Sequence, residues 1–211
     1  MGTALHAASY HGHIEVVRSL LKCGVDVDAR GLLNASSLQV ALEYGHLTVV
    51  QYLLDQGADP HFQADQHVTP LDAAAIGRYL DIVQVLLGHN AYTYSHDKVD
   101  STPSHHIFLY GNDDRDYPSV VLLLLEHGAN PNARDNKRRT PLHLVSSAEG
   151  EGFRFSSKWA VPLWRLEVAR TLLVHGADVD AKDEEGRTPM EVALANGQTK
   201  LVQLLSEYCS K

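Results

Sequence analysis

The chain has 211 residues, of which 44% are hydrophobic and 21% charged, and its formal net charge is −8 at pH 7. A negative chain is a poor general nucleic-acid binder, since phosphate contacts require clustered Lys and Arg, and the charge favours a basic partner instead. The longest apolar run, residues 120–125, is too short to cross a bilayer.

The chain has two cysteines, Cys23 and Cys209, which lie near its opposite ends. We expect no disulfide between them and a reduced, intracellular setting, cytoplasmic or nuclear.

A short motif beginning with Thr or Ser recurs along the whole chain. Its starting residues are Thr3, Ser36, Thr69, Thr102, Thr140 and Thr188. The first three intervals are 33 residues each, and the last two are 38 and 48. A period of this size predicts a repeat protein in which each unit contacts only its neighbours.

Each repeat is predicted to contain two helices. The Thr suits a helix N-cap, and a following Pro suits the first helical position. After a Gly or polar break, a second apolar stripe begins, for example between residues 14 and 21, with helical spacing. The predicted C-cap residues in left-handed conformation are Gly24, Gly57, Asn90, Gly128 and Gly176.

The segment from each C-cap residue to the next motif is always 12 residues long, and we interpret it as an extended finger. Asn34, His67, Asp100 and Gly186 lie two residues before each motif, where residues that tolerate positive φ are expected. Arg138 departs from this pattern. Because the 12-residue segment is constant, the extra residues form insertions within repeats four and five, near 112–118 and 148–165.

These residues together resemble the ankyrin repeat family over nearly the whole chain. The resemblance rests on Thr-Pro-Leu-His at 140–143, the mid-repeat Gly-His, Val-Val-x-x-Leu-Leu, and Gly-Ala-Asp-Val-Asp-Ala at 176–181. It implies an all-α solenoid of about six stacked helix-turn-helix units with β-hairpin fingers. We predict one domain, 1–211, with repeats at about 1–30, 31–63, 64–96, 97–134, 135–182 and 183–211.

The resemblance also explains many of the 13 histidines. His6, His105 and His143 occupy the last position of the motif, where the family uses the imidazole in a hydrogen-bond network between repeats. Phosphate-binding glycine loops, zinc-protease motifs, paired cysteines and nucleophile elbows are absent from the sequence. We therefore predict no enzyme, no catalytic residue, no metal site and no cofactor.

By the same resemblance, partners dock on a concave side made of finger tips and the exposed positions of each first helix. The residues that we predict to bind there are Tyr10, Leu32, Leu33, Tyr44, Ile76, Leu109, Tyr110, Lys137 and Arg139. Aromatic side chains are favoured interface anchors, although some of these could instead pack between repeats.

Two neighbouring fingers carry opposite charge. The basic one contains Arg134, Lys137, Arg138 and Arg139, and the acidic one contains Asp178, Asp180, Asp183, Glu184 and Glu185. They are either solvated finger ends or a dipolar surface that orients a partner.

The insertion of repeat five concentrates aromatic residues. Phe153, Phe155, Trp159 and Trp164 alternate there with Arg154, Lys158 and Arg165. These rings either pack back on repeats four to six or form an aromatic and basic recognition loop, and we include all four among the predicted partner-binding residues.

The sequence thus predicts a monomeric scaffold or adaptor that binds a protein or peptide, without nucleic acid binding or membrane insertion. A first alternative is a substrate-recognition module of a larger protein, of the ubiquitin-ligase-adaptor or channel type, because the first repeat lacks a polar cap. A second is an enzyme or small-molecule binder that uses the aromatic insertion.

Overall fold

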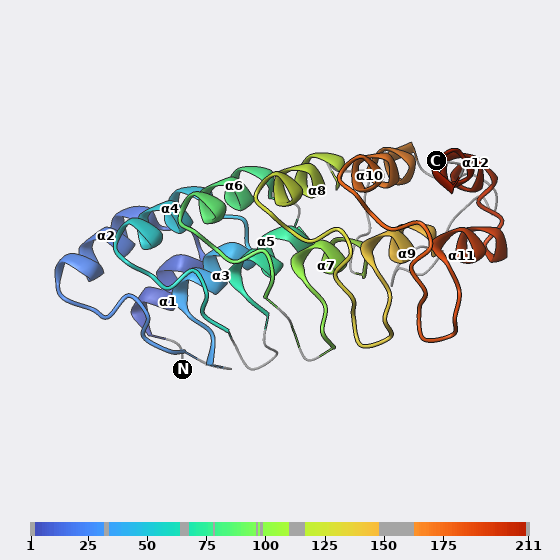
Figure 1. Cartoon of the computed structure of the whole chain (residues 1–211). Coiled ribbons are helices and arrows are strands. Elements are labelled where there is room, and N and C mark those ends of the chain that lie inside the picture. Colours follow the sequence, from blue (N-terminus) through green and yellow to red (C-terminus); the bar gives the residue numbers. More distant parts are fainter. Residues whose placement is uncertain are drawn as a thin grey trace. The chain divides into compact units, whose positions relative to one another are not determined.

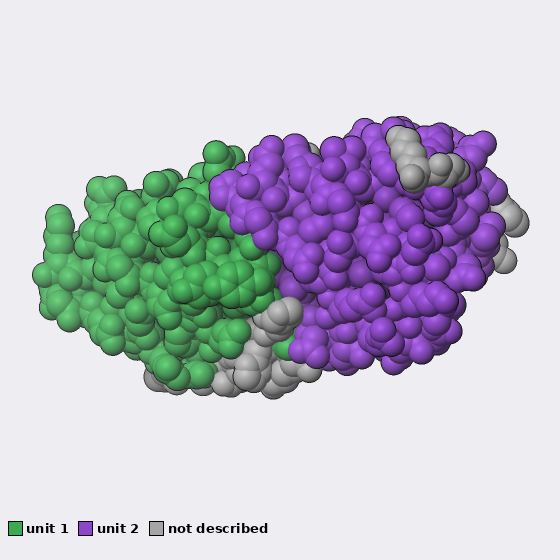
Figure 2. Space-filling model, in the orientation of Figure 1, with its two compact units in different colours: residues 1–98 green, residues 99–211 purple. Residues whose placement is uncertain are grey.

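The computed structural model describes residues 3–31, 34–63, 68–77, 79–95, 97, 99–109, 117–147 and 163–209. These residues form twelve helices and no strand. The chain divides into two compact units, Met1–Lys98 and Val99–Lys211 (Figure 2). The prediction of a single domain over the whole chain stays a prediction.

Unit 1 consists of three helix pairs. They are α1 (Ala4–Tyr10) with α2 (Ile14–Lys22), α3 (Ser37–Glu43) with α4 (Leu47–Asp55), and α5 (Pro70–Gly77) with α6 (Leu80–Gly88). The first helices α1, α3 and α5 pack side by side in one row, and the second helices α2, α4 and α6 form the other row (Figure 1).

Unit 2 repeats this arrangement with three further pairs. They are α7 (Pro103–Leu109) with α8 (Tyr117–Glu126), α9 (Pro141–Ser146) with α10 (Leu163–Val174), and α11 (Pro189–Ala195) with α12 (Thr199–Cys209). Here α7, α9 and α11 form one row and α8, α10 and α12 the other (Figure 1). The helical solenoid units predicted from the period are therefore confirmed.

The recurring motif starts the first helices as expected. The side chain of Ser36 accepts a hydrogen bond from the backbone N–H of Gln39, and Thr188 does the same for Glu191. The motif leucines Leu5, Leu38 and Leu142 are completely or almost completely buried between the two rows. Each motif therefore caps a helix and anchors it in the core at the same time.

Positive φ occurs at the predicted turns. Asn90 has a φ of 61° at its C-cap position, and Asn34 and Asp100 have φ values of 58° and 57° before the motif. The interpretation of Arg138 as a departure from this pattern is wrong, because its φ is also 58°. Asp135 holds this turn closed, since its backbone carbonyl accepts the N–H of Arg138 and its Oδ1 accepts those of the flanking residues 137 and 139. The turn thus compensates for the strain of a non-glycine residue.

The finger turns are closed by backbone hydrogen bonds that span four residues. The N–H of Gly31 donates to the carbonyl of Ala35 at 3.0 Å, and that of Asp183 donates to Arg187 at 3.0 Å. Because the described residues contain no strand, the predicted β-hairpin geometry of the fingers is not confirmed.

The predicted histidine network between repeats is confirmed. His143 Nδ1 lies 2.8 Å from Thr140 Oγ1, and its Nε2 lies 3.0 Å from the Arg187 carbonyl oxygen, in the next repeat. His6 and His105 make the equivalent bonds to their own threonine and to the residue before the next motif. Gln39 takes this role in repeat two, where its Nε2 donates to the Val68 carbonyl at 3.2 Å.

None of the helices in the described ranges is long and apolar enough to cross a membrane.

Candidate partner-binding surface

The first helices of unit 1 present a row of accessible apolar side chains. We call this set the first-helix row: Ala7, Tyr10, Val40, Tyr44, Ala73 and Ile76. Tyr10 and Tyr44 are 45% and 44% exposed, and Ile76 is half-buried. The opposite side of each helix buries its leucine and alanine residues in the core, so the amphipathic pattern leaves this row outside.

The two tyrosines of the row come from neighbouring repeats and lie together. Tyr10 ends α1, Tyr44 follows α3, and their ring centroids are 4.4 Å apart at an interplanar angle of 53°. A hydrogen bond that the Tyr44 hydroxyl donates to the Tyr10 side chain is the main cause that raises the pKa of Tyr44. His46 holds this corner, because its Nε2 lies 2.9 Å from the Tyr10 carbonyl oxygen. The pair is thus a fixed aromatic platform with two hydroxyl groups.

In unit 2 the row is buried at one of its repeat positions, whereas at the others Ala195 and Asn196 of repeat six are exposed. His106, Leu144 and Val192 correspond in repeat position to Ala7, Val40 and Ala73, and Leu144 is only 2% exposed. Ser147, which corresponds to Tyr10, is also buried. At the position of Ala7, Val40 and Ala73 the first helices are therefore open to a partner in unit 1 and closed in unit 2.

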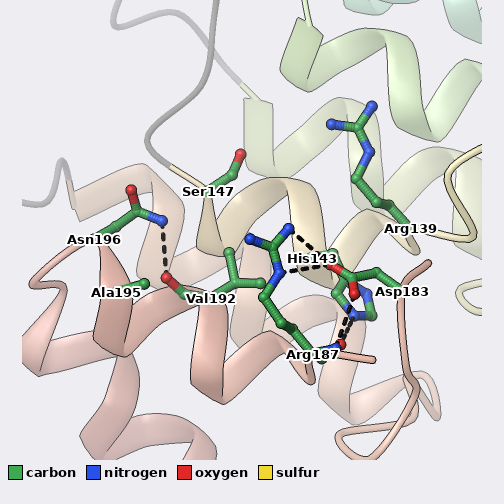
Figure 3. A pocket seen from close by; sticks show the side chains of 8 residues that line it. All are labelled: Arg139, His143, Ser147, Asp183, Arg187, Val192, Ala195 and Asn196. Atoms are coloured by element: carbon green, nitrogen blue, oxygen red, sulfur yellow. Dashed lines mark hydrogen bonds and ion pairs between the residues drawn. The ribbon is translucent and has the colours of Figure 1, made fainter. Parts of the chain in front are cut away.

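Unit 2 contains a groove of about 180 Å³ between α9, α11 and the finger turns before them (Figure 3). Its lining residues are Arg139, His143, Ser147, Asp183, Arg187, Val192, Ala195 and Asn196. The polar groups engage one another, as the dashed lines from Arg187 to Asp183 and from Asn196 to the Val192 carbonyl show (Figure 3). The exposed Ala195 and Asn196 form its accessible edge.

The charged fingers neutralise part of their own charge. Arg139 binds the carboxylate of Asp135, with both its Nε and its terminal nitrogen at 2.8 Å, and Arg187 binds Asp183 in the same way. Burial disfavours ionisation of Asp183, but the hydrogen bonds from the Arg187 backbone and guanidinium outweigh it, so its pKa lies below the ordinary value. Lys137 remains exposed on the basic turn. Both interpretations of the two fingers, as solvated ends or as a dipolar surface that orients a partner, stay predictions.

One aromatic ring of the repeat-five insertion has a defined place. Trp164 lies at the start of α10, half-buried, and stacks on the buried Tyr117 at 4.1 Å and 15°. The next residue, Arg165, is 3% exposed and donates to the carbonyls of Val145 and Ser147 at the end of α9. Burial lowers the pKa of Arg165 to about 10. These two residues thus join the helices of unit 2.

Several predicted binding residues cannot be placed. Leu32, Leu33, Tyr110, Phe153, Phe155 and Trp159 lie outside the described residues. Leu109 is the last residue of α7, and its side chain is outside them as well. The choice between the two interpretations of the aromatic insertion stays open for its other rings.

The sequence prediction missed an exposed aromatic stack in unit 1. The ring of His61 stacks on Tyr92 at 3.7 Å, and Tyr92 stacks on Tyr94 at 4.9 Å, with an interplanar angle of 18° in both cases. A signal was present in the sequence, because unit 2 has asparagine or aspartate at the positions of these tyrosines, for example Asn130 and Asn132.

No group of three or more His, Cys, Asp or Glu side chains that could hold a metal ion occurs within the described part of the chain. The two cysteines are free and exposed.

Paired helices that stack in two rows, joined by turns of constant length, define a helical repeat protein. Family models for ankyrin repeats match residues 5–97, described as three copies, 100–136 and 137–184, described as single repeats, and 164–205, described as many copies. The chain therefore belongs to the ankyrin repeat family. None of the curated proteins compared with the chain matches it. Ankyrin repeats are generally protein–protein interaction modules, and proteins built from them are typically non-enzymatic scaffolds.

Proposed function

We propose that this protein is a scaffold or adaptor that binds a protein or peptide partner on the first-helix row of unit 1. The observation that carries the proposal is the difference in exposure at equivalent positions: Val40 is accessible in unit 1, whereas Leu144 is buried in unit 2. A partner that approaches this position of the first helices meets accessible side chains in unit 1, at Ala7, Val40 and Ala73, and buried ones in unit 2.

The chemistry of the row suits an interface. Tyrosine supplies a large contact area at a low entropy cost, because it has few rotatable bonds, and its hydroxyl can bond to the partner. The ring contact of Tyr10 with Tyr44 and the bond from His46 hold the platform in place before binding. Glu43, which is exposed beside Tyr44, favours a partner with a basic group at this edge.

The finger residues Lys137 and Arg139, and the insertion residues around Trp164, stay predicted as further contact sites. Lys137 is open to solvent together with its neighbours Asn136 and Arg138, whereas Arg139 is held by Asp135 and Trp164 by Tyr117. We therefore expect Lys137 to contribute through charge and Arg139 mainly through the shape of its turn.

The test is affinity capture from cell extract with quantitative mass spectrometry, using wild type and the Tyr10→Ala, Tyr44→Ala variant. A matched control is Val16→Ala, Leu122→Ala, which also removes two exposed hydrophobic side chains, but from the second helices α2 and α8. We expect a set of partners that wild type and control retain and the tyrosine variant loses by about tenfold, as for removal of interface anchors. Equal retention by both variants, with unchanged circular dichroism, would contradict the proposal.

A further inference from the structure

We infer that His61, Tyr92 and Tyr94 form a second docking site, which binds an arginine-containing basic segment of a protein partner. This aromatic stack lies in the connections that follow α4 and α6, and it shares no residue with the first-helix row. The inference goes beyond the proposed function, because it concerns a different surface and names the chemistry of its ligand.

The stack is open to solvent. Tyr92 is 47% exposed and Tyr94 is 62% exposed, although both carry large rings. The three rings are nearly parallel, so they form one continuous ladder rather than isolated side chains. Clustered exposed aromatic surface of this kind is typical of binding sites, whereas a single exposed ring is common on any protein.

The repeat architecture does not require aromatic rings at these positions. In two other connections, polar side chains at these positions join successive repeats. In unit 1, Asp28 Oδ1 accepts the backbone N–H of Asp59 at 3.1 Å. In unit 2, Asn132 Oδ1 accepts the N–H of Asp178 at 2.7 Å, and its Nδ2 donates to the Gly176 carbonyl at 2.9 Å. The link between the second and third repeats uses the contact of His61 with Tyr92 instead. The link itself needs only His61 and Tyr92, so the 62% exposed ring of Tyr94, which extends the stack, calls for another reason.

Three aspartates lie in the connections that carry or adjoin the stack. The Oδ1 atom of Asp59 accepts the backbone N–H of His61 at 2.8 Å, so an exposed carboxylate lies against the backbone of the residue that carries the first ring. Asp28 adjoins Asp59 through the bond described above, and the exposed Asp26 accepts the N–H of Asp28 at 3.0 Å. The three carboxylates continue along the same edge of unit 1 as the rings.

This combination selects a guanidinium group. An arginine can lay its planar guanidinium on a tyrosine face and at the same time donate to a carboxylate, whereas an ammonium group is a more strongly hydrated point charge. A nucleobase could also stack on the rings, but its phosphates would be repelled by the carboxylates and by the net charge of −8. The ligand class that fits both the rings and the charge is a basic, arginine-containing segment.

The test uses the full chain and two blocked peptides that differ only in carrying arginine or lysine at alternate positions between glycines. Binding is measured by isothermal titration calorimetry and by chemical-shift changes in tyrosine-labelled protein. We expect the arginine peptide to bind about tenfold more tightly than the lysine peptide, with shifts at Tyr92 and Tyr94.

The matched variant is Tyr92→Asn, Tyr94→Asn, which installs the residues that unit 2 carries as Asn130 and Asn132 and leaves the net charge unchanged. We expect it to weaken arginine-peptide binding by about tenfold, while Tyr10→Ala, Tyr44→Ala binds as wild type does. Should the asparagine variant fail to fold, Asp26→Asn, Asp59→Asn supplies the second test and is expected to weaken binding without altering the rings.

Equal affinity for both peptides, binding that survives loss of the rings, or no saturable binding would each overturn the inference. Loss of partner capture in the Tyr10 and Tyr44 variant concerns the first-helix row alone, so the two proposals fail or stand separately.

Discussion

The two units use the same helix pairs but present different surfaces. In unit 1 the motif starts are 33 residues apart and Ala7, Val40 and Ala73 are accessible, whereas in unit 2, with intervals of 38 and 48, the equivalent residues His106, Leu144 and Val192 are buried. The comparison shows that the repeat framework does not itself determine which face is available. Residues at a few positions decide whether a first helix meets solvent or the protein interior.

A second difference concerns side chains at or near the start of a second helix. In unit 1, His46 lies just before α4 and its ring reaches the Tyr10 carbonyl at the end of α1. In unit 2, Gln198 donates to the Ser147 carbonyl at 3.3 Å, and Arg165 donates to the same carbonyl and to that of Val145. The last carbonyls of a helix lack intrahelical partners. Three side chains of different size and charge, those of His46, Gln198 and Arg165, therefore serve as hydrogen-bond donors to the carbonyls at the ends of first helices.

The largest expected effect comes from placing a charge at the equivalent positions Leu144 and Val40. Leu144→Lys should lower the free energy of unfolding by about 4 kcal/mol, because it puts an ammonium group in a buried site. Val40→Lys should change it by about 0.5 kcal/mol or less, since its side chain can reach solvent. Urea denaturation of both variants measures the difference. Similar losses would show that the units do not differ in this respect.

Removal of the buried guanidinium is expected to rank second. Arg165→Leu should cost about 3 kcal/mol, because it removes the guanidinium donor of the Val145 carbonyl and leaves the Ser147 carbonyl with Gln198 alone, whereas His46→Leu in unit 1 should cost about 1 kcal/mol. Hydrogen exchange followed by mass spectrometry would locate the loss in α9 and α10. Arg165→Lys serves as the control, and it should restore part of the stability, because it keeps one donor group. A loss that is equal for Arg165→Leu and His46→Leu would argue against the greater importance of this cap in unit 2.

Acidification should lower the folding stability of unit 2 through its buried histidines, His105 and His143. Burial lowers the pKa of His105 from 6.5 to about 4, against the opposing effect of its bond to the Arg139 carbonyl, and burial also lowers that of His143. The unfolded chain therefore binds the proton more readily than the folded one, so stability falls as the pH decreases from above 6.5 towards 4. From His105 alone we expect a loss of about 2 kcal/mol between pH 7 and pH 5.

The variant that isolates this effect is His105→Gln, since Gln39 fills the same position in repeat two and donates in the same direction. Urea midpoints at pH 7 and pH 5 should differ less in this variant than in wild type. An unchanged pH dependence would mean that His105 titrates normally in the folded protein.

The smallest expected effect concerns the tyrosine pair of unit 1. Tyr10→Phe removes the hydroxyl that raises the pKa of Tyr44, so the pKa of Tyr44 should move back towards 10.0 while the stability changes by less than about 0.5 kcal/mol. NMR titration of tyrosine labelled at the ring carbon that bears the hydroxyl would follow it. A Tyr44 pKa that does not move would show that the two hydroxyls are not bonded in solution.

The period and its motif predicted much of the fold. Thr188 as an N-cap, Asn90 as a left-handed C-cap and His143 as a link between repeats follow from local rules, because each role depends on backbone positions that recur at fixed spacing. Arg138 was interpreted wrongly for the opposite reason, since its conformation depends on Asp135, whose side chain closes the turn.

The sequence alone therefore determined the family, the helix pairs and the candidate tyrosines Tyr10 and Tyr44, because repeat spacing dictates which helix face points outward. It could not determine that Leu144 is buried while Val40 is accessible, or that His61, Tyr92 and Tyr94 stack. Those features depend on contacts between residues far apart in the sequence or in adjacent repeats. Only the tertiary structure decides them, since burial and stacking are properties of neighbours in space.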